Sequence, residues 1–316
     1  MSINEIAALA NVSKGTVSRV INNKGYVSEA TRKKVEDVIR ENNYVPNQLA
    51  RNLSNGNSKT VAIMCPYPGY ECITRGILAA ACEADYAAVF FETHLNPEKE
   101  RHILNLLKEH YFDALIILRC SLPYSEIEEY QTEKNNIVTC QMNDSDKIST
   151  LALDFTSLQT SITNFIKYRQ EDFGIVLSRD AIMADEIQTT MHATYNELQA
   201  DNQFVYQIEP GMAGGIDFAE YIIENNEMAT LPDVMWFDDV TTAAGFKQTF
   251  QFANLDVPDI IVLGVSPLAQ FAQFITLSCH EYKYGQLVYN LIGQPISKEL
   301  LTSNVTLPSK LNPELA

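Results

Sequence analysis

The sequence lacks the residue patterns that build metal sites and disulfide scaffolds. Its 316 residues include one tryptophan, five histidines and six cysteines. No cysteines form a CxxC pair and no histidines form an HExxH motif, so the spacings do not favour a metal site. Because the chain is long and its cysteines are scattered, we expect reduced, mostly buried thiols. The composition therefore predicts no metal and no cofactor.

Long hydrophobic segments are also missing. No run of 18 apolar residues occurs, which argues against a membrane span. The N-terminus lacks the apolar segment of a signal peptide, so we expect a cytoplasmic protein. Nucleophile-elbow and Walker sequences are absent, and an enzyme is therefore not expected. The glycine cluster Gly211–Gly215 lacks the spacing of a phosphate-binding loop, and we predict a loop at the mouth of a cleft.

Positive charge is scarce but concentrated at one end of the chain. The formal net charge is −17, yet residues 1–60 contain nine Lys or Arg and five Asp or Glu. The first 60 residues are therefore net positive, and the remainder carries the acidic excess. This asymmetry predicts a small basic module joined to a larger acidic body. A basic module attracts polyanions such as nucleic acid, whereas the acidic body repels them.

The basic module has the pattern of three short helices. Ser2 and Glu5 form a capping-box sequence, and a first helix follows until about Asn11. Ser13 is placed to cap a second helix over residues 14–22, and Ser28 a third over about residues 29–42. A tight turn between the first two helices indicates a helix-turn-helix DNA-binding domain over residues 1–45.

The rest of the chain alternates between strand and helix patterns. Residues 46–58 read as a short hinge helix and a linker, and residues 59–316 as the core. Alternation of apolar strands with amphipathic helices predicts parallel sheets covered by helices on both faces. We expect an α/β core of two doubly wound lobes: the first about 59–155 and 281–305, the second about 156–280. Predicted strands lie at 60–64, 87–91, 114–118, 136–140, 150–154, 173–177, 204–208, 234–237 and 260–263. Predicted helices lie at 73–84, 97–110, 126–133, 158–168, 184–198, 217–225, 242–250 and 282–292.

Residues 6–22, IAALANVSKGTVSRVIN, resemble the helix-turn-helix of LacI/GalR-type bacterial transcription regulators. Further matches are Val27-Ser28, Thr31-Arg32, the segment Asn43–Asn47 and Ala50–Leu53. The match is dense over residues 3–64; beyond it the resemblance is mainly architectural, to two lobes like those of periplasmic sugar-binding proteins. It implies a dimeric, sequence-specific regulator, most often a repressor, on a palindromic operator in double-stranded DNA.

The resemblance assigns roles to residues of the second helix. Lys14, Gly15 and Arg19 match positions that face base edges in the major groove, where Arg can bind guanine. At Gly15 either a close approach of the backbone or weaker selectivity at one base pair is implied. Short polar side chains are suited to phosphate oxygens, and backbone contacts are expected from three further residues. The short polar residues are Ser13, Thr16, Ser18 and Asn22, and the three further residues are Tyr26, Ser28 and Arg32.

The hinge resembles the family's minor-groove segment. Leu53 matches the apolar wedge that enters between central base pairs and kinks the duplex. Asn47, Ala50 and Arg51 are expected to line that groove. An ordinary linker is the alternative interpretation.

The expected effector cleft departs from the family's pattern. In many members an Arg on the helix after the second lobe's first strand holds sugar hydroxyls, but residues 183–192 contain none. The region Trp236–Gly245 differs by one residue in spacing, and Ser266 follows Gly264 where an Asp is usual. Two hypotheses stay open: a different small molecule, or a core without a ligand that is controlled by a protein partner or by protein level. The candidate ligand residues are Tyr67, Tyr70, Trp236, Asp238, Asp239 and Ser266.

A homodimer is implied by the resemblance but is not marked by a sequence stripe. Ile73, Ile77 and Leu78 are candidates for a dimer face, and ordinary core packing explains them equally well. A periplasmic solute receptor would suit the two lobes, but the basic front module and the missing export signal oppose it.

Overall fold

The computed structural model describes residues 2–22, 25–44, 57–66, 70–178, 186–198, 204–264, 266–277 and 280–302. The chain separates into two compact units, Met1–Lys59 and Thr60–Ala316. Hinge residues Asn47, Ala50, Arg51 and Leu53, and the cleft candidate Tyr67, lie outside the described residues.

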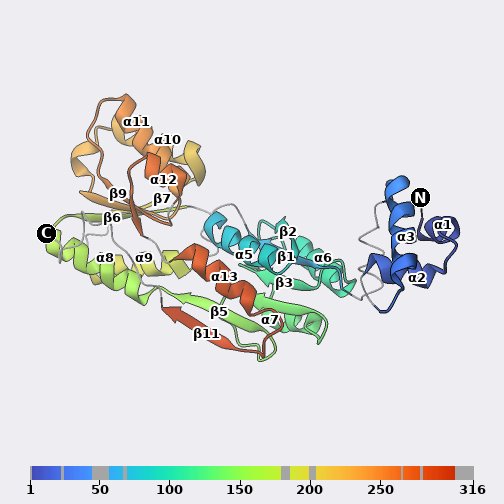
Figure 1. The fold of residues 1–316 in the computed structure, drawn as a ribbon. Helices are drawn as coiled ribbons and strands as arrows, with labels where there is room; N and C mark the ends of the chain where they lie inside the picture. The colour runs from blue at the N-terminus through green and yellow to red at the C-terminus, as the bar shows by residue number, and fades with distance from the viewer. Residues whose placement is uncertain are drawn as a thin grey trace. The chain divides into compact units, whose positions relative to one another are not determined.

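The N-terminal unit contains the three short helices expected of a helix-turn-helix (Figure 1). They are α1 (Ile3–Leu9), α2 (Lys14–Ile21) and α3 (Glu29–Glu41). Ile6, Val17 and Val35, one from each helix, are fully buried and form the centre of a small core. Between α1 and α2, Asn11 adopts a left-handed conformation with φ of 50°. Asparagine tolerates this region better than most residues, which explains the sharp turn at this position.

The first lobe is built on a six-stranded parallel sheet with the order β11-β5-β4-β3-β1-β2. Strand β2 lies at one edge of the sheet. Strand β11, the last strand in chain order, lies at the other edge and pairs with β5. The strands are β1 (Thr60–Cys65), β2 (Ala87–Glu92), β3 (Ala114–Ile117), β4 (Asn136–Thr139), β5 (Ser149–Asp154) and β11 (Lys298–Thr302).

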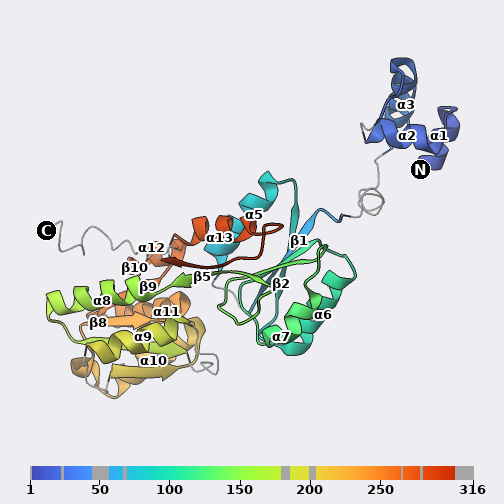
Figure 2. The same ribbon diagram turned by 90° about the horizontal axis from the view of Figure 1, so that it is seen from below.

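Helices cover both faces of this sheet, as Figure 2 shows. Alternate residues of β1 point to opposite faces: Val61 and Ile63 pack towards α5 (Glu71–Glu83) and α13 (Glu281–Asn290). Ala62 and Met64 pack towards α6 (Pro97–Lys108) and α7 (Tyr124–Ile127). A strand that is buried on both faces explains the continuous apolar run TVAIMC.

The second lobe has a five-stranded parallel sheet with the order β10-β9-β8-β6-β7. Both lobes therefore share one winding pattern, in which the first strand lies between the second and the third. The expected fold class, two doubly wound parallel-sheet lobes behind a helix-turn-helix unit, is confirmed. The strands are β6 (Phe173–Ser178), β7 (Val205–Ile208), β8 (Val234–Phe237), β9 (Asp259–Leu263) and β10 (Ile275–Leu277).

Two helix layers also enclose the second sheet. On one face α8 (Thr156–Arg169) and α9 (Glu186–Glu197) pack against Ile175 and Trp236. On the other face α10 (Gly211–Glu224), α11 (Val240–Phe252) and α12 (Pro267–Phe271) pack against Val176 and Phe237.

The glycine cluster Gly211–Gly215 is not the predicted loop but the beginning of α10. A Cβ on Gly215 would lie 2.0 Å from the carbonyl oxygen of Thr242, and one on Gly245 would lie 2.1 Å from that of Met212. The glycines therefore allow the backbones of α10 and α11 to touch, which a side chain at either position would prevent. The prediction failed because a glycine run was interpreted as a turn signal, whereas here it serves close helix packing.

Other differences concern short elements. The predicted helix over 126–133 is instead the short α7 followed by a 3₁₀ turn, Glu128–Tyr130. Helix α12 and strands β10 and β11 were not predicted. In the part of the chain that the structure describes, no helix combines the length and the apolar character needed to cross a bilayer.

Candidate DNA-binding face and candidate cleft

Each helix of the N-terminal unit begins at a serine that caps it. Ser2 accepts a hydrogen bond from the backbone N–H of Glu5, and the Glu5 carboxylate accepts one from the Ser2 N–H at 2.7 Å. Ser13 accepts from the Thr16 N–H at 3.1 Å, and Ser28 from the Thr31 N–H at 3.4 Å. These caps satisfy N–H groups that have no partner inside the helix, so α1, α2 and α3 have sharply defined starts.

Helix α2 presents the three predicted base-reading residues to solvent. Lys14, Gly15 and Arg19 are all exposed, while Val17 and Val20 on the opposite side are buried in the core. Gly15 and Arg19 are four positions apart and lie on the same side of the helix, and Lys14 lies about 100° from Gly15 around the axis, so all three belong to the exposed half of α2. The two cations make this face positive, and α2 contains no acidic residue.

The short polar residues of α2 are partly occupied by contacts within the helix. The Ser13 and Thr16 hydroxyl oxygens lie 2.9 Å apart, and the Asn22 amide donates to the Ser18 hydroxyl at 3.2 Å. Ser18 and Asn22 are half-buried, whereas Ser13 is exposed. These contacts orient the hydroxyl groups while leaving their remaining hydrogen-bonding capacity available, since a hydroxyl both donates and accepts.

Two further predicted contact residues follow α2. Tyr26 is 90% exposed, which is unusual for a large aromatic side chain in a folded unit. The Ser28 hydroxyl lies 2.8 Å from that of Thr31 in the first turn of α3. Ser28 therefore serves as the N-cap of α3, and because it is exposed it can also contact a phosphate.

In the second lobe, a carboxylate and an amide meet where strand β8 ends. The Gln188 side chain of α9 donates to Asp238 at 2.6 Å. Asp238 directly follows β8, which lies beside β6, the first strand of this sheet. Ligands of doubly wound folds bind outside the carboxyl ends of strands at such a switch point. Gln188 was not among the predicted ligand residues. For its helix, the sequence showed only the absence of the arginine that many family members have there.

Two of the candidate cleft residues are helix caps. Asp239 begins α11 and accepts from the Thr242 N–H at 2.6 Å and from the hydroxyls of Thr241 and Thr242. Ser266 begins α12 and accepts from the Ala269 N–H at 3.0 Å. Their side chains serve local structure, which leaves them less free to hold a ligand.

The aromatic candidates also have packing roles. Trp236 is fully buried among apolar residues between the second sheet and α8 and α9, so its ring is part of the core. Tyr70 is half-buried before α5 and packs against the core of the first lobe. Of the described candidates, Asp238 is thus the side chain best placed for a ligand, and sequence spacing alone did not separate it from its neighbours.

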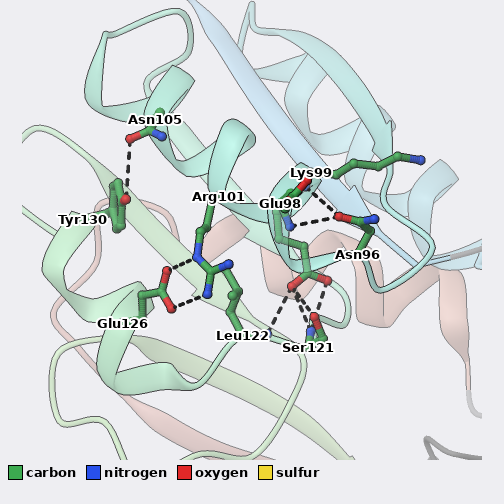
Figure 3. Close-up of polar contacts among 10 residues, drawn as sticks. Asn96, Glu98, Lys99, Arg101, Asn105, Ser121, Leu122, Glu126 and Tyr130 are labelled. Atoms are coloured by element: carbon green, nitrogen blue, oxygen red, sulfur yellow. Dashed lines mark hydrogen bonds and ion pairs between the residues drawn. The ribbon is translucent and has the colours of Figure 1, made fainter.

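The first lobe contains a buried carboxylate that the sequence did not reveal. Glu100 in α6 is fully buried and accepts from the Ser121 N–H at 3.0 Å, the Ser121 hydroxyl at 2.8 Å and the Leu122 N–H at 3.1 Å. Nearby on the surface, Arg101 and Glu126 form a two-point ion pair with distances of 2.7 and 3.1 Å (Figure 3). These contacts attach the segment after β3 to α6.

Burial around Glu100, which we call the Glu100 anchor, also affects the neighbouring thiol of Cys120. Desolvation, with the nearby Glu100 charge, raises the pKa of Cys120 to about 12. The thiol is therefore held in its neutral form at physiological pH. Across the described residues, His, Cys, Asp and Glu side chains form no group of three that could hold a metal ion.

Residues 2–47 match the family described as bacterial regulatory proteins, lacI family. The chain is 41% identical to catabolite control protein B of Bacillus subtilis over 143 residues. That match spans 44% of this chain and 46% of the relative's length. It is 26% identical to catabolite control protein A of Staphylococcus epidermidis, across 98% of this chain and 97% of that protein.

A solved structure with the same architecture is the lac repressor dimer bound to operator and an anti-inducer. Its TM-score is 0.79 at 17% identity, and the match covers 97% of each chain. At this identity the likeness concerns the fold: a helix-turn-helix unit and two lobes with parallel sheets.

Proposed function

We infer that this chain, which belongs to the LacI/GalR family of bacterial transcription regulators, binds a palindromic operator as a homodimer and represses transcription from it. The proposed activity is binding, not catalysis, and it acts on DNA in the cytoplasm. The observation that carries the proposal is the exposed face of α2, where Lys14, Gly15 and Arg19 lie together on a capped helix.

The charge distribution supports contact with DNA through the N-terminal unit. The basic residues of α2 neutralise phosphates or reach base edges, and the acidic core is repelled by the same polyanion. In this proposal the hinge residues Asn47, Ala50 and Arg51 contact the minor groove and Leu53 enters it. The roles of these four residues are assigned by their resemblance to the family's hinge segment.

Exposed apolar side chains support a homodimer. In the first lobe, Leu78 on α5 and the edge-strand residues Val89 and Phe90 are exposed. In the second lobe, Phe252 is 79% and Phe271 88% exposed. Such large apolar side chains favour burial against a partner, and a second copy would place two recognition helices on one inverted repeat. Of the other dimer-face candidates, Ile77 is fully buried and Ile73 half-buried, and both belong to the core instead.

The function is tested by selection from a duplex pool that carries randomised inverted repeats. The full chain should enrich one palindrome and bind it about 10³-fold or more tightly than a scrambled duplex of the same composition. Light scattering should give the mass of a dimer, and Phe271→Ser should shift it towards the monomer. Enrichment of no sequence would overturn the proposal.

We propose that a small molecule, such as a sugar or a sugar derivative, binds between the lobes and controls operator affinity. Asp238 and its partner Gln188 lie at the strand end where such ligands bind in this fold class. A ligand at 100 times its Kd should add about 2.7 kcal/mol to the stability of the core. A thermal-shift screen with sugars, phosphosugars and nucleosides, repeated with Asp238→Ala, identifies the ligand and its site.

The alternative is a regulator whose core has lost its ligand and is controlled by a protein partner or by protein level. The capping roles of Asp239 and Ser266 and the buried ring of Trp236 favour it, because these side chains are occupied by the protein itself. A screening hit that also changes operator affinity would reject this alternative; a screen in which no compound moves either quantity would favour it.

A further inference from the structure

We propose that Trp236 is a specificity-determining residue of the second lobe: its indole N–H group and the Asp238 carboxylate together bind one hydroxyl group of a polyhydroxy compound, such as a sugar or a polyol. The inference rests on the proposed control by a small molecule and deepens it, because it names the ligand group that this strand end recognises. It also gives a role to a polar atom that the fold does not use.

The indole N–H group of Trp236 is buried without a hydrogen-bond partner among the described residues. The whole side chain is fully buried, and apolar residues of α8 and α9 pack around its ring. Buried tryptophan N–H groups usually have an acceptor, because a donor that loses water and gains no partner destabilises the fold. Packing therefore accounts for the carbon atoms of this ring but not for its nitrogen.

Trp236 lies beside the pair formed by Asp238 and Gln188. It is the last residue but one of β8, and Asp238 follows that strand and continues its ladder by donating to the Val176 carbonyl oxygen at 3.1 Å. Residues two apart in a strand point to the same face, and their Cα atoms are about 7 Å apart. Both side chains lie on the α9 side of the sheet, since Trp236 packs against its apolar residues and Asp238 accepts from Gln188 at 2.6 Å. The buried donor and the carboxylate therefore share one strand end, at the switch point between β8 and β6.

These two groups select one kind of ligand group. An indole N–H only donates a hydrogen bond, and a carboxylate only accepts. A hydroxyl group accepts from the first and donates to the second at the same time. An ammonium group has no acceptor for the indole, whereas a phosphate or a carboxylate has no proton for Asp238 and is repelled by its charge. The pair of Trp236 and Asp238 therefore favours a hydroxyl group over acidic and basic groups at this position.

The first experiment uses the full chain with ¹⁵N-labelled tryptophan. Trp236 is the one tryptophan of the sequence, so its indole N–H gives a single resonance. The probes are neutral pentoses, hexoses and polyols at millimolar concentration, each tested in parallel by thermal shift. A compound that raises the melting temperature should also move the indole resonance downfield, because the N–H gains an acceptor. Stabilisation without any change of this resonance would overturn the inference while small-molecule control stands.

Two replacements of Trp236 test the donor itself. In the benzothiophene analogue of tryptophan a sulfur atom takes the place of the N–H, so the ring keeps its size and the core its packing. Affinity for the sugar that binds best should fall about tenfold. Trp236→Phe should show the same loss together with a lower melting temperature, because the smaller ring leaves space in the core. The control Phe250→Leu shortens a buried side chain on the other face of the sheet and should lower the melting temperature without changing affinity.

Deoxy sugars identify the hydroxyl group. Each hydroxyl of the sugar that binds best is replaced in turn by hydrogen. At one position the replacement should weaken binding by the unmodified chain much more than binding by the chain with the benzothiophene analogue, because that chain already lacks the donor. Unchanged affinity of the analogue-containing chain, or equal effects of every deoxy position on both proteins, would overturn the inference. If no probe raises the melting temperature, control by a hydroxyl-bearing molecule fails as well, so the two failures are distinguishable.

Discussion

The methylene groups of Arg19 lie against Gly25, where the chain turns after α2. Its Cδ is 3.6 Å from the point that a Cβ of Gly25 would occupy, and Gly25 has a φ of +75°. Gly25 therefore lies beside the aliphatic part of the Arg19 side chain, and the backbone there limits the room on that side. A preoriented arginine loses less side-chain entropy when it binds a base.

Replacement of Arg19 by alanine should cost about 1–3 kcal/mol of operator binding, because one arginine–guanine contact is lost. Selectivity should relax at one base pair of each half-site and persist elsewhere. Binding of a complete set of single-base operator variants measures this. Arg40→Ala, on the exposed last turn of α3, is the matched control and should lower affinity equally for all variants. A uniform loss for Arg19→Ala would contradict its role as a base reader.

Replacement of Gly25 tests the turn itself. Gly25→Ala should destabilise the N-terminal unit by about 1 kcal/mol, because an alanine is strained at positive φ. Gly25→Asn should be milder, since asparagine tolerates this conformation, as Asn11 does at φ 50°. Hydrogen exchange of peptides from residues 2–44 measures both effects. If both variants exchanged at the same rate as the unmodified chain, the stability of the N-terminal unit would not depend on the positive φ of Gly25.

Sequence patterns predicted most long elements because local signals and tertiary packing agree there. The three serine caps and the buried strand of residues 60–65 are examples in which neighbouring residues suffice. The failures have non-local causes. Strand β11 exists because Lys298–Thr302 pairs with β5, about 150 residues earlier in the chain, and α10 begins at Gly211 because α11 packs directly on its glycines.

The candidate sites divide in the same way. Exposure of Lys14, Gly15 and Arg19 follows from helical periodicity, which a sequence displays. The pairing of Gln188 with Asp238 joins two elements 50 residues apart, and periodicity does not show it. Likewise, a carboxylate in the first turn of a helix normally suggests a solvent-exposed residue, so the burial of Glu100 had no local signal.

The close approach of α10 and α11 at Gly215 and Gly245 should make the second lobe sensitive to a single methyl group. Gly215→Ala places a Cβ 2.0 Å from the Thr242 carbonyl oxygen, so α10 and α11 must separate. Overpacking of this kind costs about 1–3 kcal/mol or more. Thermal unfolding followed through Trp236, the one tryptophan of the chain, reports on this lobe. Gly15→Ala is the matched control and should leave this transition in place; equal melting temperatures for all three proteins would refute the close packing.

The buried carboxylate of Glu100 should matter more than its exposed neighbour. Glu100→Ala leaves the N–H groups of Ser121 and Leu122 without their acceptor, at about 1–3 kcal/mol for each buried group. Glu100→Gln keeps one acceptor oxygen and should cost less. Glu98→Ala, in the same turn but exposed, should change stability by about 0.5 kcal/mol or less. Urea unfolding followed by circular dichroism ranks the variants; similar midpoints for Glu100→Ala and Glu98→Ala would argue against the anchor.

The surroundings of the Glu100 anchor also predict how fast the thiols of Cys120 and Cys82 are alkylated. Burial, helped by the Glu100 charge, raises the pKa of Cys120 from 9.0 to about 12, whereas Cys82 is exposed on α5. Alkylation requires the thiolate, so at pH 8 iodoacetamide should modify Cys82 quickly and Cys120 very slowly in the folded chain. The pKa of Cys120 is higher in the folded chain than in the unfolded chain. Its contribution to the free energy of unfolding is therefore fully present below pH 9 and is lost as the pH rises towards 12. Glu100→Gln removes the neighbouring charge, which should lower the Cys120 pKa and speed its alkylation relative to Cys82. Mass spectrometry of time points between pH 7 and 10 gives both rates, and comparable rates for the two cysteines would show that Cys120 is not buried beside the carboxylate.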